Sequence, residues 1–563
     1  MRAIKSKIKE VTATSKGRII ALSILIFLFA LVTGGIWYWN THKKAIIKDK
    51  LETAIREKTN GLYKIHYDSL EMDEIAGHLS VSNVHLVYDS NKYKELEKQG
   101  KAPSMLLDIQ IPGIEATGVK TPRALIENEI VGSKLEIIDP VISIMYTHAN
   151  SDSLRVVPPK EVYEQILGSL DLIQVDTLII RGAQITTSNL RTKRIAAQIQ
   201  DVSAIMIDVK VDSTSSTDTT RLLFAKQVGI SCGKASWESV NKLYNYSADS
   251  LSVSSVSQDV RIKNIRVSPM LNEDAFVNAL PTQDDRFDFS INNIRLKNIN
   301  MLQLFEQNIK ADSMLISSAT FKIYRDLARP RDNKNRVGTY PHQAIMKLPV
   351  GLNIRKIILQ NTFLEYKERN HITRKSGKVQ LYNLYASISN FTNDSQAISV
   401  NNIMTLNMSS RFLNKTSLNT NWIFYLKNPA GRFDLKGTCG AINATLLNPL
   451  TEPMGPAHIK KGIINGIEFN LKGQNNGMGG TVKMLYEDLH VTMLEKDKGV
   501  AELDKKTLAS FLANIMITNA NPKRNDEPRV MQVYLERDIN HSIYYLAWKT
   551  IFKGLKETVG IKK

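Results

Sequence analysis

The segment SLEMDEIAGHLSVSNVHLVY, residues 69–88, has a second copy 181 residues later, SLSVSSVSQDVRIKNIRVSP, residues 250–269. The two copies align without a gap, three positions are identical, and six more positions are apolar in both. An apolar residue at every second position is typical of a β-strand with one apolar and one polar face. The preserved phase therefore predicts a strand unit that occurs twice along a lengthening sheet.

A shorter module of apolar residues recurs between these copies and beyond the second. Its spacings are three, two, three and two, as in VDTLIIRGAQI from Val175, INNIRLKNINM from Ile291 and ADSMLISSATF from Ala311. Shorter versions begin at Leu135 and Ile354. A step of three inside a period of two requires a bulge or corner that returns the side chains to the same face. The module thus predicts bent strands.

The chain shows no regular alternation of strands and helices, which disfavours a doubly wound parallel fold. We expect a mainly β protein with an elongated, curled antiparallel sheet shaped like a groove, and few short helices. The helical patterns are at residues 159–170, 272–280, 301–307 and 504–516. Polar loops are expected at 212–220 and 329–341.

Residues 19–39 carry no charge. As a helix they would rise about 31 Å, close to the thickness of the hydrocarbon core of a bilayer. Trp37, Tyr38 and Trp39 end the segment, where aromatic side chains favour the membrane interface. We expect an uncleaved, single-pass transmembrane helix rather than a signal peptide.

The more basic flank precedes this helix, which favours residues 1–18 in the cytoplasm and the rest of the chain on the far side. The expected organisation is a cytoplasmic tail at 1–18, the transmembrane helix at 19–39, a β-repeat body at 40–500 and C-terminal helices with a short strand at 501–563. The net charge of +19 allows anionic partners. An exported body makes nucleic acid an unfavourable one, so no nucleic-acid partner is expected.

The sequence offers little for catalysis or metal binding. GISCG, residues 229–233, matches the G-x-S-x-G pattern around Ser231, but it lacks the strand–helix context of a hydrolase. The ten histidines include no metal-binding spacing. Cys232 and Cys439 are the two cysteines, and free thiols are favoured over a disulfide. We expect no enzyme activity, no cofactor and no metal.

The chain resembles the AsmA-like family of diderm bacteria. The resemblance rests on the N-terminal anchor, on NGLYKIHYDSLEMDEIAGHLSVSNVHL (60–86) and on units such as LEIIDPVISI (135–144). A C-terminal segment at about 400–500, including FDLKGTCGAINATLLNPLTEPMG (433–455), is similar to that family too. The abundant Asn and Lys look most like members from Bacteroidota.

The resemblance implies an inner-membrane helix that carries a periplasmic β-groove related to bridge-like lipid-transfer proteins. It implies phospholipid or another acyl lipid as cargo, support for outer-membrane biogenesis, and contact of the C-terminal end with the outer membrane or one of its proteins. From the residues alone, a curled sheet without a covering helical layer leaves apolar space in which acyl chains are stabilised. Two alternatives stay open: a non-transporting scaffold for outer-membrane protein assembly, and a binding module for a glycan or protein.

The apolar positions of the repeated units are the predicted lining of the groove. They are Leu70, Met72, Leu79, Val81, Val84, Leu86, Ile137, Ile142, Leu178, Ile180, Ile185, Val260, Ile262, Ile294, Leu296, Met314, Ile316, Phe321, Ile357 and Leu359.

The C-terminal tail, YYLAWKTIFKGLKETV (544–559), is predicted to be a basic amphipathic helix. Tyr544, Trp548, Ile551 and Leu555 fall on its apolar face. Such a helix either lies on an anionic bilayer or caps the end of the sheet.

Overall fold

The computed structural model describes Arg56 and residues 59–73, 75–119, 129–146, 172–215, 218–371, 374–454, 457–493 and 518–560. The chain is 59% strand and 13% helical, with 24 strands in one mixed sheet, so the mainly β prediction is confirmed. The predicted helices at 19–39, 159–170 and 504–516 lie outside the described residues. Within the described ranges, no helix has the length and apolar character needed to cross a bilayer.

The chain divides into two compact units. Unit 1 comprises residues 1–240 and 246–262, and unit 2 comprises residues 241–245 and 263–563. Two strands contain the divisions, β11 (Tyr244–Ala248) and β13 (Asp259–Pro269).

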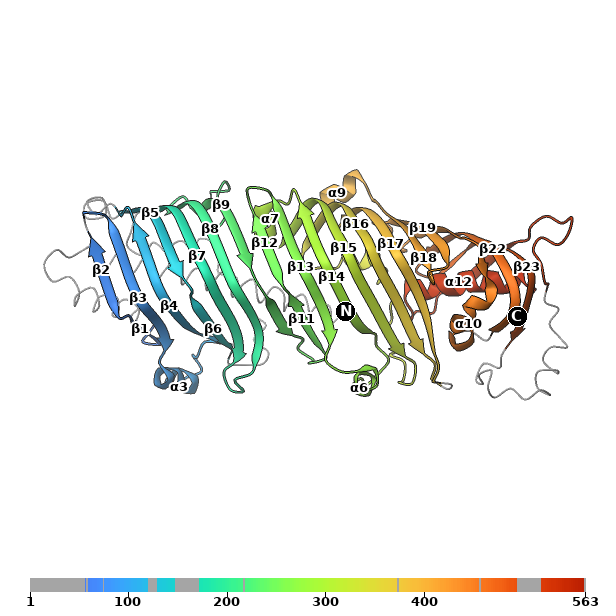
Figure 1. Cartoon of the computed structure of the whole chain (residues 1–563), viewed down its shortest axis with the longest axis horizontal. Coiled ribbons are helices and arrows are strands. Elements are labelled where there is room, and N and C mark those ends of the chain that lie inside the picture. The colour runs from blue at the N-terminus through green and yellow to red at the C-terminus, as the bar shows by residue number, and fades with distance from the viewer. Residues whose placement is uncertain are drawn as a thin grey trace. The chain divides into compact units, whose positions relative to one another are not determined.

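In unit 1 the strands cross the sheet in chain order (Figure 1). Three pairs of consecutive strands, 63–66 with 69–73, 129–138 with 141–146 and 225–232 with 235–238, pair with the same neighbouring strand rather than with each other. The strands are β1 (Tyr63–His66), β2 (Ser69–Asp73), β3 (His78–Tyr88), β4 (Met105–Thr117), β5 (Glu129–Ile138), β6 (Val141–Tyr146), β7 (Leu172–Asn189), β8 (Ile195–Asp212), β9 (Ala225–Cys232), β10 (Ala235–Glu238) and β12 (Ser250–Ser254). Helix α3 (Ser90–Lys98) follows β3 and begins after Asp89, whose side chain accepts hydrogen bonds from the backbone amides of Asn91 and Lys92.

Unit 2 has the same serial arrangement over longer strands (Figure 1). They are β14 (Arg286–Lys297), β15 (Asn308–Asp326), β16 (Gly351–Arg369), β17 (Ser376–Thr392), β18 (Ile403–Phe412), β19 (Thr416–Tyr425), β20 (Phe433–Cys439), β21 (Ile442–Asn443), β22 (Ala457–Gln474), β23 (Gly477–Met493) and β24 (Val530–Glu536). Its helices are α6 (Glu273–Asn278), α7 (Met301–Phe305), α8 (Pro341–Ile345), α9 (Ser395–Val400), η1 (Ala444–Leu447), α10 (Asn448–Met454) and α12 (Ile543–Thr558).

The predicted repeat extends well beyond the two quoted segments. Strands β2 and β3 have the same lengths as β12 and β13, and both pairs are 181 residues apart. The strands β4, β7 and β8 match β14, β16 and β17 at the same offset, with ends that differ by at most two residues. A tyrosine marks both copies: the amide of Leu107 donates to the Tyr63 hydroxyl at 3.0 Å, and the amide of Phe287 donates to the Tyr244 hydroxyl at 3.1 Å.

The bulges predicted from the steps of three are present. Register shifts fall between Ile180 and Ala183, and between Leu359 and Thr362. Asn, Asp and Gly accept left-handed backbone at the least steric cost, and they supply most of the residues at these steps. The residues with positive φ at these steps are Asn83, Asp139, Gly182, Asn264, Ser318 and Asn361. The bend of each strand thus depends on a single residue that accepts left-handed backbone.

The expectation of an antiparallel sheet is wrong in part, since the sheet is mixed. Strand β7 runs parallel to β5 and β6, and β16 runs parallel to β15. Parallel neighbours require a crossover connection of a dozen or more residues. Residues 147–171 and residues 327–350 make these connections, at equivalent places in the two copies. The sequence predicted a helix in the first segment and a loop in the second. It gave no indication that these connections make the strands on either side of them parallel.

Helix α12 lies on one face of β23 and β24. Its buried residues are Ile543, Leu546, Ala547, Thr550, Gly554 and Thr558. This packing agrees with the capping alternative for the C-terminal tail. The prediction that Tyr544 belongs to the buried apolar face of this helix was wrong, because Tyr544 is 66% exposed.

Candidate functional site

The predicted lining residues of unit 1 lie in rows across one face of the sheet. Ile137 pairs with Ile114 of β4 on one side and with Ile180 of β7 on the other. Val81 pairs with the same Ile114, and Leu70 pairs with Val81. These side chains are buried. The alternation of apolar and polar residues along each strand thus brings side chains from five strands into one apolar row.

The remaining predictions in unit 1 follow the same pattern. Leu86 pairs with Ile109, Ile109 with Ile142, and Ile142 with Ile185. Met72 pairs through the backbone with Leu79. The other predicted positions, on these strands and on β13, are buried or half-buried: Leu79, Val84, Leu178, Val260 and Ile262.

In unit 2 the predicted residues also share a face. Leu296 pairs with Met314, and Met314 pairs with Ile357. In the next row, Ile316 pairs with both Ile294 and Leu359.

A third row, through Phe321, contains residues that the sequence analysis missed. Phe289 and Leu364 flank Phe321, and Leu381 and Phe412 continue the row into β17 and β18. The rings of Phe289 and Phe321 meet edge-on, with centroids 5.1 Å apart. The alternating stretch RFDFSI (286–291) carried the signal for this row, because Phe287, Phe289 and Ile291 are two residues apart.

Exposure divides the apolar face of unit 2 into two parts. Beneath α8, α9 and α12 the face is a closed core, in which Phe433 and Leu471 are fully buried. On β14, β15 and the middle of β16, ten apolar side chains of this face are only half-buried, although their neighbours Leu296 and Ile357 are buried. We call the ten half-buried residues the open apolar rows: Phe287, Phe289, Ile291, Ile294, Met314, Ile316, Phe321, Ile323, Leu359 and Leu364.

Charged residues border the open apolar rows at one end. Arg325 lies two positions beyond Ile323 on the same face, pairs in register with Glu368, and binds Asp285 at 2.7 Å. The Tyr366 hydroxyl donates to Glu368 at 2.7 Å, and burial, followed by the charge of Glu368, raises the pKa of Tyr366. These groups satisfy one another, so they form a polar boundary rather than a reactive centre.

Tyr544 of α12 lies beside the closed core. Its ring meets Trp422 of β19 edge-on, with centroids 6.4 Å apart. Burial among neighbouring groups raises its pKa, yet 66% of the side chain remains exposed.

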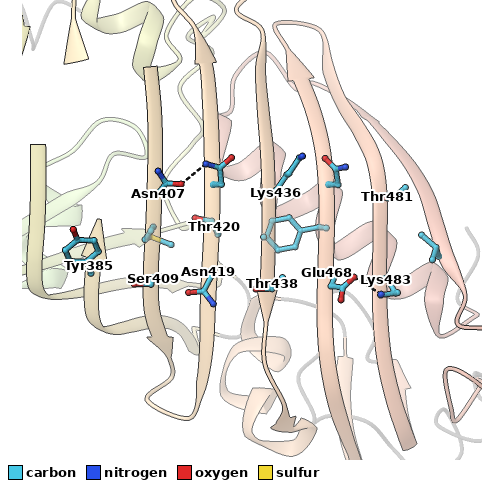
Figure 2. Close-up of a pocket in the computed structure, with 16 residues that line it drawn as sticks. Tyr385, Asn407, Ser409, Asn419, Thr420, Lys436, Thr438, Glu468, Thr481 and Lys483 are labelled. Carbon is cyan, nitrogen blue, oxygen red and sulfur yellow. Dashed lines mark hydrogen bonds and ion pairs between the residues drawn. The ribbon is translucent and has the colours of Figure 1, made fainter. Parts of the chain in front are cut away.

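The opposite face of unit 2 is hollowed over β17–β24, and mostly polar side chains line the hollow together with Met408, Phe469 and Val530. The hollow has a volume of about 710 Å³. We call it the polar hollow; Figure 2 shows side chains from neighbouring strands lining it. One of its cross-strand rows consists of Asn407, Asn421, Lys436, Asn470 and Thr481.

The weak motifs gain no chemical context. GISCG lies in β9 and the turn after it, where Ser231 pairs with Ser203 and Ser252 in the sheet. Cys232 and Cys439 form no disulfide and are half-buried. Within the described ranges, no group of His, Cys, Asp and Glu could hold a metal ion.

Comparisons with known proteins add no family. No family model matches the sequence, and no curated protein is significantly similar to it.

Proposed function

We propose that the open apolar rows of unit 2 receive the acyl chains of a lipid, and that the protein carries phospholipid between the membranes of a bacterial envelope. The observation that supports this most is the continuous row of half-buried side chains on β14–β16. Apolar side chains that stay partly exposed to water in adjacent rows support a binding surface. An acyl chain gains about 0.8 kcal/mol for each CH₂ that it buries.

The proposal includes the resemblance to the AsmA-like family. A helix at 19–39 would anchor the chain in the inner membrane, and the body would lie in the periplasm. We expect a reporter enzyme fused after Lys563 to be active outside the cytoplasm. A reporter active in the cytoplasm would contradict this topology and, with it, the proposed route between membranes.

The alternative is a scaffold for outer-membrane protein assembly that carries no lipid. The tightly buried rows of unit 1, such as Leu135 and Ile137, and the closed core beneath α12 favour it. A closed core supports a rigid body but leaves no place for a ligand.

Site-specific photo-crosslinking tests the lipid proposal. A photoreactive residue in place of Phe321 should capture phospholipid in living cells, because this side chain belongs to the open apolar rows. The same residue at Lys322, which is exposed on the opposite face of β15, is the matched control. Equal labelling at the two positions, or none at Phe321, would favour the scaffold.

A charge scan separates an open surface from a closed core. Ile316→Asp places a carboxylate where water can still reach it, so the protein should fold while lipid capture falls. Ile180→Asp buries a carboxylate at a side chain only 6% exposed, and should unfold unit 1. Unfolding by Ile316→Asp as severe as that by Ile180→Asp would show that the rows of unit 2 are closed too.

A further inference from the structure

The polar hollow contains a second row beside the one through Lys436. Two positions along each strand from the first row, and on the same face, lie Tyr385, Ser409, Asn419, Thr438, Glu468 and Lys483. The hollow thus presents amides, hydroxyls and one exposed aromatic ring on six adjacent strands. Such an array offers hydrogen-bond donors and acceptors in two parallel lines.

The charges in the hollow do not cancel. Lys483 is neutralised by Glu468 at 2.6 Å. Lys436 makes no ion pair in the part of the chain that the structure describes, and its partners in register are the amides Asn421 and Asn470. One exposed ammonium therefore stands in the middle of a neutral polar surface.

Several side chains of the hollow are free to bind a ligand. Asn407 and Asn421 bind each other at 2.7 Å, but Asn419, Asn470 and Thr438 have no side-chain hydrogen bond within the described ranges. Tyr385 lies at one end of its row and is 43% exposed. A flat aromatic ring at the edge of an amide-rich surface is suited to stacking on an apolar face of a sugar ring.

We propose that the polar hollow binds an oligosaccharide that carries a carboxylate. Sugar hydroxyl and acetamido groups match the amide and hydroxyl side chains, and the carboxylate matches Lys436. Neighbouring strands are about 4.8 Å apart, close to the advance of an extended glycan per sugar ring. Successive rings can therefore meet successive strands.

This site lies on the face opposite the closed core and the open apolar rows. Its ligand and its measurement differ from those of the lipid proposal, so either proposal can fail without the other.

The test uses full-length protein in detergent and two six-ring glycans. Hyaluronan hexasaccharide carries glucuronate carboxylates, and chitohexaose is neutral. By titration calorimetry we expect hyaluronan hexasaccharide to bind more tightly. Lys436→Met should weaken its binding about tenfold, as expected for the loss of one charge-assisted hydrogen bond, with little effect on chitohexaose.

Lys472→Met is the matched control, because Lys472 is an exposed lysine on the same face of β22 and lies outside the hollow. It removes the same charge and should leave both affinities unchanged. Tyr385→Ala should weaken both glycans, since stacking does not depend on the carboxylate. If neither glycan binds, or if Lys436→Met and Lys472→Met lower the affinity for hyaluronan hexasaccharide equally, the proposal is overturned.

Discussion

Asn83 and Asn264, 181 positions apart, have the same left-handed backbone, with φ of 50° in each. Each lies between two apolar residues three positions apart, Val81 and Val84 in β3 and their equivalents in β13. A left-handed residue at this step returns the following side chain to the face that it would otherwise leave. The bend of each strand therefore depends on one asparagine, and the asparagine occurs at the same place in both copies of the strand.

The first prediction concerns this backbone. Asn264→Val should destabilise the protein by about 1–2 kcal/mol, because a β-branched residue is strained at positive φ. Asn264→Gly should change stability by less than about 1 kcal/mol, because glycine accepts this conformation. Denaturant unfolding of the purified body measures both. Equal losses would mean that the Asn side chain, rather than the backbone, matters here.

A second prediction concerns the contact of α12 with the sheet. A Cβ added at Gly554 would lie 2.5 Å from the Cβ of Val482. Gly554→Ala should therefore cost about 1–3 kcal/mol, although the same change stabilises an exposed helix by roughly 1 kcal/mol. Limited proteolysis of the C-terminal helix reports the loss. Adding Val482→Ala should recover part of it, and failure to do so would contradict the close contact.

The third prediction concerns His342 of α8. It is fully buried against Phe424, and neither ring nitrogen has a hydrogen-bond partner. Burial lowers its pKa to about 4 from 6.5, so the unfolded chain takes up the proton more readily than the folded one. Stability should be complete above pH 6.5 and fall by roughly 3 kcal/mol as the pH approaches 4.

Thermal unfolding across this pH range, compared with His342→Leu, measures the effect. The variant should lose the part of the acid sensitivity that His342 causes, because leucine cannot take up a proton. An unchanged pH profile would contradict the assignment to His342.

A fourth prediction concerns the buried carboxylate of Asp326. It binds Arg374 at 2.8 Å and Arg369 at 2.5 Å, and its side chain is fully buried. Asp326→Ala should destabilise unit 2 by about 3 kcal/mol, because two guanidinium groups lose their shared partner. The control, Asp312→Ala, breaks an exposed pair with Arg355 and should cost less than about 1 kcal/mol. Similar losses in the two variants would contradict the role of burial.

Local pattern was sufficient for some elements and insufficient for others. Helices α6 and α7 lie within the segments predicted from the sequence, and Asn272 and Asn300 cap them through their side chains. Helix α3 was missed because its outward residues are charged and only Tyr93 is buried. The row through Phe321 was predicted at one residue; the alternation around Phe289 indicated a second, and the register of five strands joined the others to them.

The sequence by itself determined the strands, the face that each apolar residue occupies, the bulges and the duplication. These depend on spacings of two and three residues and on backbone preferences that act within a few positions. Only the tertiary structure decided the parallel pairs, the helix that covers the core, and which apolar rows stay open. Those features depend on contacts between residues far apart in the chain, and a periodic pattern reads the same whether its apolar face meets a helix, another strand or a ligand.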